Sequence, residues 1–169
     1  MLRKLAYLST GANARSHLIT QALALEGKIT VPRLVPPQAE FIAAAPQDSV
    51  DYFRVRIDPT KSGMTDKVLR LEFTDGDKPV VGLHVRRAIA EFLPAPDDHF
   101  RRADITIALT GEAWAALYLS QTTIAEMVAN GSAEIKTGDP QEVIELFDIF
   151  DRYHPEKAVL VAPHLHDPN

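Results

Sequence analysis

Cysteine is absent from the 169 residues of this chain. The chain therefore has no disulfide framework, no thiol nucleophile and no cysteine-ligated zinc site, which is typical of a reducing compartment. A surplus of positive charge is also lacking, because 18 basic residues stand against 23 acidic ones and give a net charge of −5. Since nucleic-acid-binding domains usually carry a clustered basic surplus, we expect no nucleic-acid partner.

Long apolar runs are missing as well. No run approaches the ~20 apolar residues of a membrane-spanning helix, and the apolar stretch at 5–8 is too short for a signal peptide. We therefore expect a cytoplasmic chain without a membrane span. The Gly-x-Ser-x-Gly pattern of a nucleophile elbow and the Gly-rich loops that bind phosphate are also absent, so the sequence predicts no catalytic residue and no cofactor.

The composition that remains, 46% hydrophobic and 24% charged, is typical of a folded domain with a sizeable core. Apolar residues at helical spacing predict a helix over 14–26 that ends at Gly27. Prolines then make a non-helical connector, and a short helix is expected over 38–45. Further along the chain, apolar and polar residues alternate as in strands with one face in water. We expect these strands at 53–57, 68–74, 79–86, 88–93 and 103–109.

Helical spacing returns beyond residue 110. The segment 121–140 predicts a short helix, a stop, a short strand and the start of another helix. Thr123 and Glu126 have the spacing of a capping box, and Gly131 stands where a helix needs a left-handed residue. Asp139 and Pro140 suit a new helix start. This order of elements predicts an α+β fold, in which a mainly antiparallel sheet of about five strands carries helices on one face.

The segment 121–140 resembles the closing section of sterol-carrier-like domains, and more closely the C-terminal domain of alkylsulfatases. Four other segments resemble, in the right order, that domain's first strand, first hairpin turn, fourth strand and last helix, and these are 51–57, 73–75, 103–110 and 146–151. Residues 15–25 resemble the last helix of the dimerisation domain that precedes it in those enzymes. Arg86-Arg87 departs from the pattern, because the family usually turns there through an Asn-Gly-type sequence.

The resemblance implies three parts, which are a helical extension at 1–45, a sterol-carrier-like domain at 46–162 and a tail at 163–169. In that family a separate metallo-β-lactamase-type domain with a binuclear zinc site performs the hydrolysis, and this chain has no counterpart of it. The resemblance therefore implies a noncatalytic accessory domain. It does not imply that this chain alone acts as an alkyl sulfatase, which is a sulfuric ester hydrolase. We expect no metal in this domain.

In sterol-carrier-like folds, helices above the sheet can enclose a tunnel for an acyl or alkyl chain. The resemblance thus implies an apolar small molecule as partner, namely a fatty acid, an alkyl sulfate or a lipid. The residues expected to line the cavity are Phe73, Trp114, Leu117, Tyr118, Ile124, Met127 and Val128. Arg54 and Arg56 are the candidates to hold a sulfate or carboxylate head group.

The alternative is a structural module whose interior is packed, since protein interiors normally contain few voids. The same apolar residues would then be core, and the domain would serve for dimerisation or for docking to a separate metallo-β-lactamase-type hydrolase chain. An apolar stripe on the first helix, together with the resemblance to a dimerisation domain, favours a homodimer. The stripe consists of Leu18, Ile19, Ala22 and Leu25.

Histidines supply a third and weaker hypothesis, a small metal-dependent hydrolase. His164 and His166 could share a zinc ion, and the Asp167 carboxylate could assist. Because these residues lie at the C-terminus, where chains are usually solvated, we expect a tail rather than a ligand set. His84, on an expected strand, is interpreted as a histidine with satisfied hydrogen bonds rather than a catalytic base.

Overall fold

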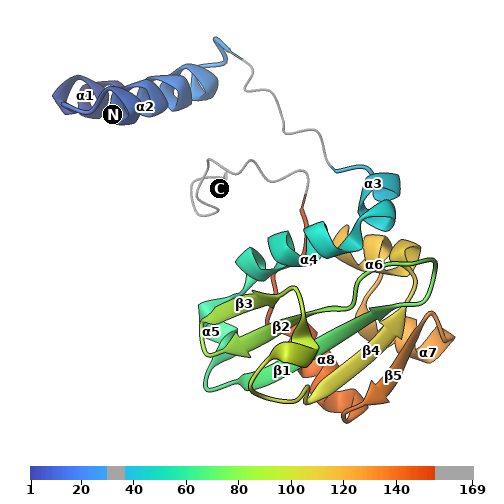
Figure 1. The fold of residues 1–169 in the computed structure, drawn as a ribbon. Helices are drawn as coiled ribbons and strands as arrows, with labels where there is room; N and C mark the ends of the chain where they lie inside the picture. Colours follow the sequence, from blue (N-terminus) through green and yellow to red (C-terminus); the bar gives the residue numbers. More distant parts are fainter. Residues whose placement is uncertain (30–36, 155–169) are drawn as a thin grey trace. The chain divides into compact units, whose positions relative to one another are not determined.

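The computed structural model describes residues 1–29 and 37–154, which belong to two compact units (Figure 1). The N-terminal unit contains α1 (Leu2–Leu8) and α2 (Ala12–Leu25), which pack on each other. Two hydrogen bonds, of 2.7 and 2.8 Å, join the Arg3 guanidinium to the Glu26 carboxylate after α2. These bonds lower the pKa of Glu26 to about 2. The domain boundaries expected at 45/46 and 162/163 stay a prediction.

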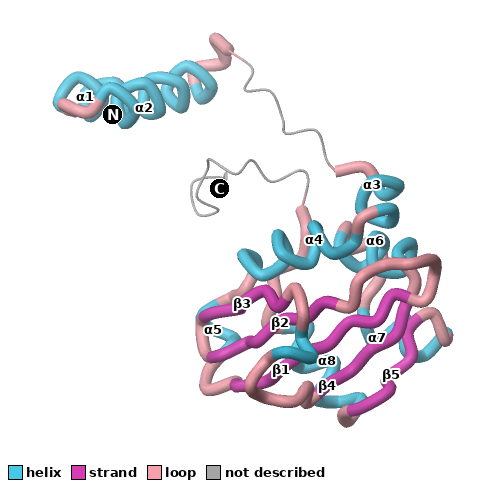
Figure 2. Tube along the Cα trace, in the orientation of Figure 1, coloured by secondary structure: helices cyan, strands magenta, loops and turns pink. Residues whose placement is uncertain are grey.

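The larger unit contains one sheet of five strands, which lie in the order β3-β2-β1-β4-β5 (Figure 2). Every neighbouring pair is antiparallel except β1 and β4, which are parallel. The expected α+β fold with a mainly antiparallel sheet is therefore confirmed, and so is the hairpin that turns at Asp75-Gly76-Asp77. The strands are β1 (Asp66–Phe73), β2 (Val81–Arg86), β3 (Ile89–Leu93), β4 (Ile105–Leu109) and β5 (Ala133–Thr137).

The helices of this unit cover one face of the sheet. Leu69 of β1 is paired in register with Leu83 of β2 and with Ile105 of β4, so the three side chains share that face. They belong to one hydrophobic cluster with side chains from α4, α6, α7 and α8. The helices are α3 (Ala39–Ala44), α4 (Pro46–Phe53), α5 (Pro59–Ser62), α6 (Gly111–Tyr118), α7 (Ile124–Asn130) and α8 (Pro140–Asp148). Within the described residues, no helix is long and apolar enough to cross a membrane.

The strand expected at 53–57 is wrong. Helix α4 occupies the residues up to Phe53, and the 3₁₀ helix η1 (Arg54–Arg56) follows it. Pro46 begins α4 at a position that needs no amide donor, and the buried residues of α4 recur at helical spacing. The alternation that suggested a strand is accidental, because Val55 is 73% exposed whereas Phe53 is 5% exposed.

The helix and strand predicted from 121–140 are confirmed in detail. Both halves of the capping box form at the start of α7, since Thr123 Oγ1 accepts the Glu126 N–H and the Glu126 carboxylate accepts the Thr123 N–H. The hydrogen bonds from Thr123 lower the pKa of Glu126. Gly131 ends α7 with a φ of 79°. Asp139 caps α8 by accepting the Gln141 N–H at 2.8 Å.

The turn between β2 and β3 explains how Arg86-Arg87 replaces an Asn-Gly-type sequence. Arg87 takes a φ of 55°, a left-handed conformation that asparagine and glycine adopt more readily. Its N–H donates to the Thr65 carbonyl oxygen at 2.6 Å, so the chain before β1 holds the turn. The hairpin thus keeps a tight turn despite the larger side chain.

Candidate functional site

A cluster of aromatic rings joins the helices above the sheet. The Phe53 ring of α4 meets the Trp114 ring of α6 edge to face, with centroids 5.3 Å apart, and lies 4.6 Å from the Phe150 ring. The Trp114 indole N–H donates to Ser49 Oγ at 2.6 Å, and Ser49 Oγ donates to the Pro46 carbonyl at 2.7 Å. Helices α4 and α6 are therefore joined by both packing and a buried hydrogen bond.

The seven residues expected to line an apolar cavity belong to one hydrophobic cluster on the helix-covered face. Trp114 and Met127 are fully buried in it, whereas Leu117 and Val128 are partly buried at its edge. The structure thus brings the expected set together, and its role in ligand binding stays a prediction. The residues come from β1 (Phe73), α6 (Trp114, Leu117 and Tyr118) and α7 (Ile124, Met127 and Val128).

A groove of about 390 Å³ lies beside α4, and we call it the α4 groove. Its floor includes Val81, which is 2% exposed and belongs to the hydrophobic cluster just described. Phe92, also in the floor, is partly buried and packs against that cluster. The Tyr52 side chain, which is 66% exposed, stands at its side. The lining residues are Gln47, Asp48, Asp51 and Tyr52 of α4 and Pro79, Val81, Phe92 and Pro94. The groove is therefore an opening at the surface of the same apolar cluster.

One polar atom in the α4 groove lacks a partner. The side-chain oxygen of Gln47 is buried and accepts no hydrogen bond from the described residues. Leaving a buried acceptor unpaired costs about 1–3 kcal/mol.

The two candidate head-group arginines have different surroundings. Arg54 lies near the α4 groove, because its Nε donates to the Asp51 carboxylate at 2.6 Å. Arg56 donates to the Tyr118 carbonyl oxygen at 2.7 Å, and its guanidinium lies 3.9 Å from the centroid of the Tyr118 ring. Arg56 therefore stabilises the end of α6, whereas Arg54 is exposed to an incoming anion. The head-group role of both stays a prediction.

An aspartate in the first hairpin fixes the start of α6. The Gly111 N–H donates to Asp75 Oδ1 at 2.7 Å, and Lys78 pairs with the same carboxylate. The Lys78 hydrogen bond and then the Gly111 amide lower the pKa of Asp75. Because the folded-state pKa is lowered, this stabilisation is present above the ordinary carboxyl pKa of about 4 and is lost as the pH falls further.

The histidine predictions have separate outcomes. His84 is buried on β2, with Nε2 2.8 Å from Asp66 Oδ1, so it has the satisfied hydrogen bond expected of it. His164, His166 and Asp167 lie outside the described residues.

The α4 groove was not found from the sequence. The strand wrongly expected at 53–57 hid the helix that carries Tyr52, and the position of Phe92 beside that helix depends on how the sheet and α4 pack. One signal was available, because Pro46, Val50 and Phe53 follow helical spacing.

Comparisons with known proteins identify the family of the larger unit. The family described as alkyl sulfatase C-terminal matches residues 38–159. The stereoselective inverting sec-alkylsulfatase Pisa1 from Pseudomonas sp. is similar in structure, with 19% identity and a TM-score of 0.64, over 94% of this chain and 24% of that one. Palmitated SCP2L2 from Aedes aegypti is also similar, with 17% identity and a TM-score of 0.48, over 65% of this chain and 98% of that one. The chain spans about a quarter of the length of Pisa1. A search of curated proteins found no match.

Proposed function

Because this chain belongs to the alkyl sulfatase C-terminal family, we propose that it is a noncatalytic accessory domain that binds the apolar chain of an amphiphile. The sterol-carrier-like fold expected from the sequence is confirmed. The observation behind this proposal is the apolar floor of the α4 groove. Val81 in that floor belongs to the cluster that holds the seven expected lining residues, and Phe92 packs against the same cluster. An alkyl chain on this floor gains about 25 cal/mol per Å² of apolar surface removed from water. Fatty acids, alkyl sulfates and lipids all carry such a chain.

The size of the α4 groove suits this ligand class. Its volume of about 390 Å³ falls within the roughly 300–1,000 Å³ of small-molecule sites. Helix α4 is eight residues long, and its buried link to α6 is the Trp114–Ser49 hydrogen bond with the ring contacts around Phe53. None of the seven expected lining residues lines the α4 groove itself, so they would contact a ligand only if this short helix moved away from α6.

The head group of the ligand would lie at the rim of the α4 groove. Arg54 pairs there with Asp51, and both side chains are more than two-fifths exposed. An exposed ion pair contributes little stability, so an anionic head group can replace the Asp51 carboxylate at small cost. A guanidinium binds sulfate or carboxylate through two parallel hydrogen bonds. Arg54 would therefore favour anionic amphiphiles over neutral ones.

Dodecyl sulfate below its micellar concentration should bind with saturable heat and raise the melting temperature. A ligand at 100 times its dissociation constant stabilises the fold by ~2.7 kcal/mol. Tyr52→Glu should weaken binding by at least tenfold, because it places a charge beside the apolar floor. Arg54→Gln should weaken the binding of dodecyl sulfate but not of dodecanol. Titration calorimetry and thermal melts of each variant measure both effects.

Two variants serve as controls for this experiment. Tyr7→Glu makes the same change at a 74% exposed tyrosine of the N-terminal unit, and Arg86→Gln removes an exposed arginine from the sheet. Neither should alter binding. A panel of C10 to C18 amphiphiles without saturable heat would remove the carrier function and leave a structural module.

Exposed apolar residues on the N-terminal unit favour a second candidate function, self-association or docking to a separate metallo-β-lactamase-type hydrolase. Ala6 of α1 and Ala22 of α2 are buried, whereas other apolar side chains of the unit are exposed to solvent. Twofold dimers are the commonest closed assembly, so a homodimer is the simplest partner for this surface. The exposed residues include Leu5, Tyr7, Leu8 and Leu25.

Deleting residues 1–30 should therefore leave the larger unit folded and reduce the sedimentation coefficient by more than the lost mass explains. Analytical ultracentrifugation at micromolar concentration measures this change, and circular dichroism checks the fold. A full-length chain that sediments as a monomer at high micromolar concentration would contradict the dimer.

A further inference from the structure

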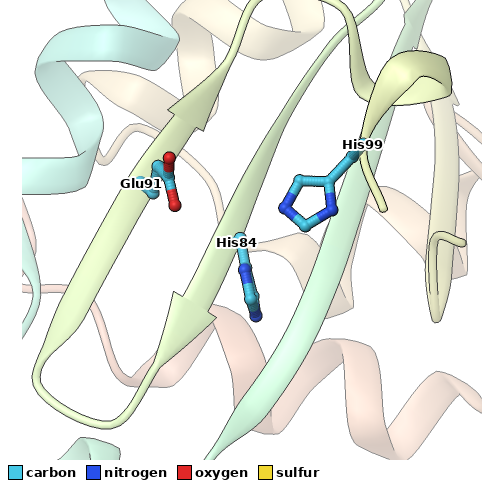
Figure 3. A group of neighbouring side chains, drawn as sticks. All are labelled: His84, Glu91 and His99. Carbon is cyan, nitrogen blue, oxygen red and sulfur yellow. The ribbon is translucent and has the colours of Figure 1, made fainter. Parts of the chain in front are cut away.

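The face of the sheet opposite the helices carries a cluster that the accessory function does not use. It consists of His84 on β2, Glu91 on β3 and His99 just after the 3₁₀ helix η2 (Pro96–Asp98), and Figure 3 shows the three side chains. His84 and Glu91 are directly opposite in the β2–β3 register. One nitrogen or carboxylate oxygen from each residue lies within 4.8 Å of those of the other two.

From this geometry we infer that His84, Glu91 and His99 bind a zinc ion. Zinc takes imidazole nitrogen and carboxylate oxygen at about 2.0–2.2 Å, and many zinc sites use three protein ligands with water in the fourth position. Ligand atoms of such a tetrahedral site lie roughly 3.4 Å apart, a spacing that follows from those bond lengths. No pair of ligand atoms therefore needs to close by more than about 1.4 Å, and the exposed Glu91 side chain can supply its share of that movement by changing rotamer.

Hydrogen bonding already prepares His84 as a ligand. Its Nε2 lies 2.8 Å from Oδ1 of Asp66, and a carboxylate can only accept. Nε2 therefore carries the proton, and Nδ1 keeps the lone pair that a metal requires. The Arg101 guanidinium also donates to Asp66 and holds that carboxylate in place. A carboxylate that orients a histidine in this way is the usual second partner of a metal-binding imidazole.

His99 is less well prepared. Its Nδ1 accepts the Arg101 backbone N–H at 3.1 Å, so an ion that takes this imidazole must break that local bond. The His99 ring stacks on the Phe100 ring at 4.3 Å, and the Phe100 side chain is exposed, so the segment can adjust without disturbing the core.

Competition with a chromogenic chelator tests the inference on the full-length chain. We expect one tightly bound zinc ion, and Co²⁺ in its place should give the visible absorption of a site with nitrogen ligands. Glu91→Gln and His99→Gln should each weaken zinc binding by more than tenfold. Asp66→Asn, which removes the orienting carboxylate and its ion pair with Arg101, should weaken it by roughly 10–100-fold. Thermal melts of each variant verify that it is folded.

Matched controls separate this site from other histidines and acids. His17→Gln on α2 and Glu134→Gln on β5 remove exposed side chains of the same types, and neither should change the affinity. The double variant His164→Gln/His166→Gln should also keep the ion. Absence of bound zinc overturns the inference, and so does an affinity that Glu91→Gln and His99→Gln leave unchanged. Loss of the ion in the double variant alone would assign it to the C-terminal residues instead.

Discussion

Trp114→Ala should lower the free energy of unfolding by about 3–5 kcal/mol, the usual cost of removing a large aromatic side chain from a core. Trp114 is fully buried, and its ring contacts those of Phe53 and Tyr118. The change also deprives the buried Ser49 hydroxyl of its donor. Urea denaturation followed by circular dichroism measures the effect, because Trp114 is the only tryptophan and its loss removes the fluorescence signal.

Trp114→Phe is the matched control, since it keeps most of the apolar surface and loses chiefly the indole hydrogen bond. It should cost less than half as much as alanine. An alanine cost below about 1.5 kcal/mol, well under the usual 3–5 kcal/mol for a large buried aromatic residue, would show that the space around Trp114 collapses easily or is already open. That result would favour a cavity for an alkyl chain over a packed interior.

Gly111→Ala should also be strongly disruptive, with a cost of about 1–3 kcal/mol or more. A Cβ at Gly111 would lie 2.3 Å from the Ala43 carbonyl oxygen, and backbone cannot yield as a flexible side chain does. Helix α3 would have to move away from α6, on which it packs. The Gly111 N–H would also be displaced from Asp75. Thermal and urea denaturation measure the loss.

Gly11→Ala supplies the control at the start of another helix. A Cβ there meets its nearest neighbour, the Ala14 Cβ, at 3.8 Å, which is ordinary contact. Its effect should therefore stay below that of Gly111→Ala, at about 0.5–1 kcal/mol, because it only replaces glycine with the less favourable alanine at the N-cap of α2. If the two changes cost the same, close approach of α3 is not what requires glycine at 111.

Local chemistry accounts for the parts of the fold that the sequence predicted. Thr123, Glu126 and Gly131 act within a few residues of one another, so their spacing was enough to predict α7 and its end. The hairpin at Asp75-Gly76-Asp77 is also local, because the turn joins two segments of alternating residues. The order of the elements predicted the helix-covered sheet, and the resemblance added the family.

The remaining features depend on contacts between distant residues. Alternation over 53–57 matched a strand by accident, and the burial of Phe53 against Trp114 decides in favour of α4. The α4 groove requires a helix and a strand to meet, which no short pattern encodes. Likewise, His84 faces Glu91 only because of the β2–β3 register. The sequence therefore predicted the apolar cluster but not its opening or the histidine cluster.

The parallel pairing of β1 with β4 has a consequence for synthesis on the ribosome. Phe73 of β1 pairs in register with Leu109 of β4, and β2 and β3 are translated between them. At ~5–20 residues per second, the ribosome needs roughly two to seven seconds to make that segment. During this time β1 can pair with β2 on one side, while its other edge still lacks a partner. A nascent chain at this stage exposes an open strand edge in the middle of its future sheet, the kind of surface on which chaperones act and chains aggregate.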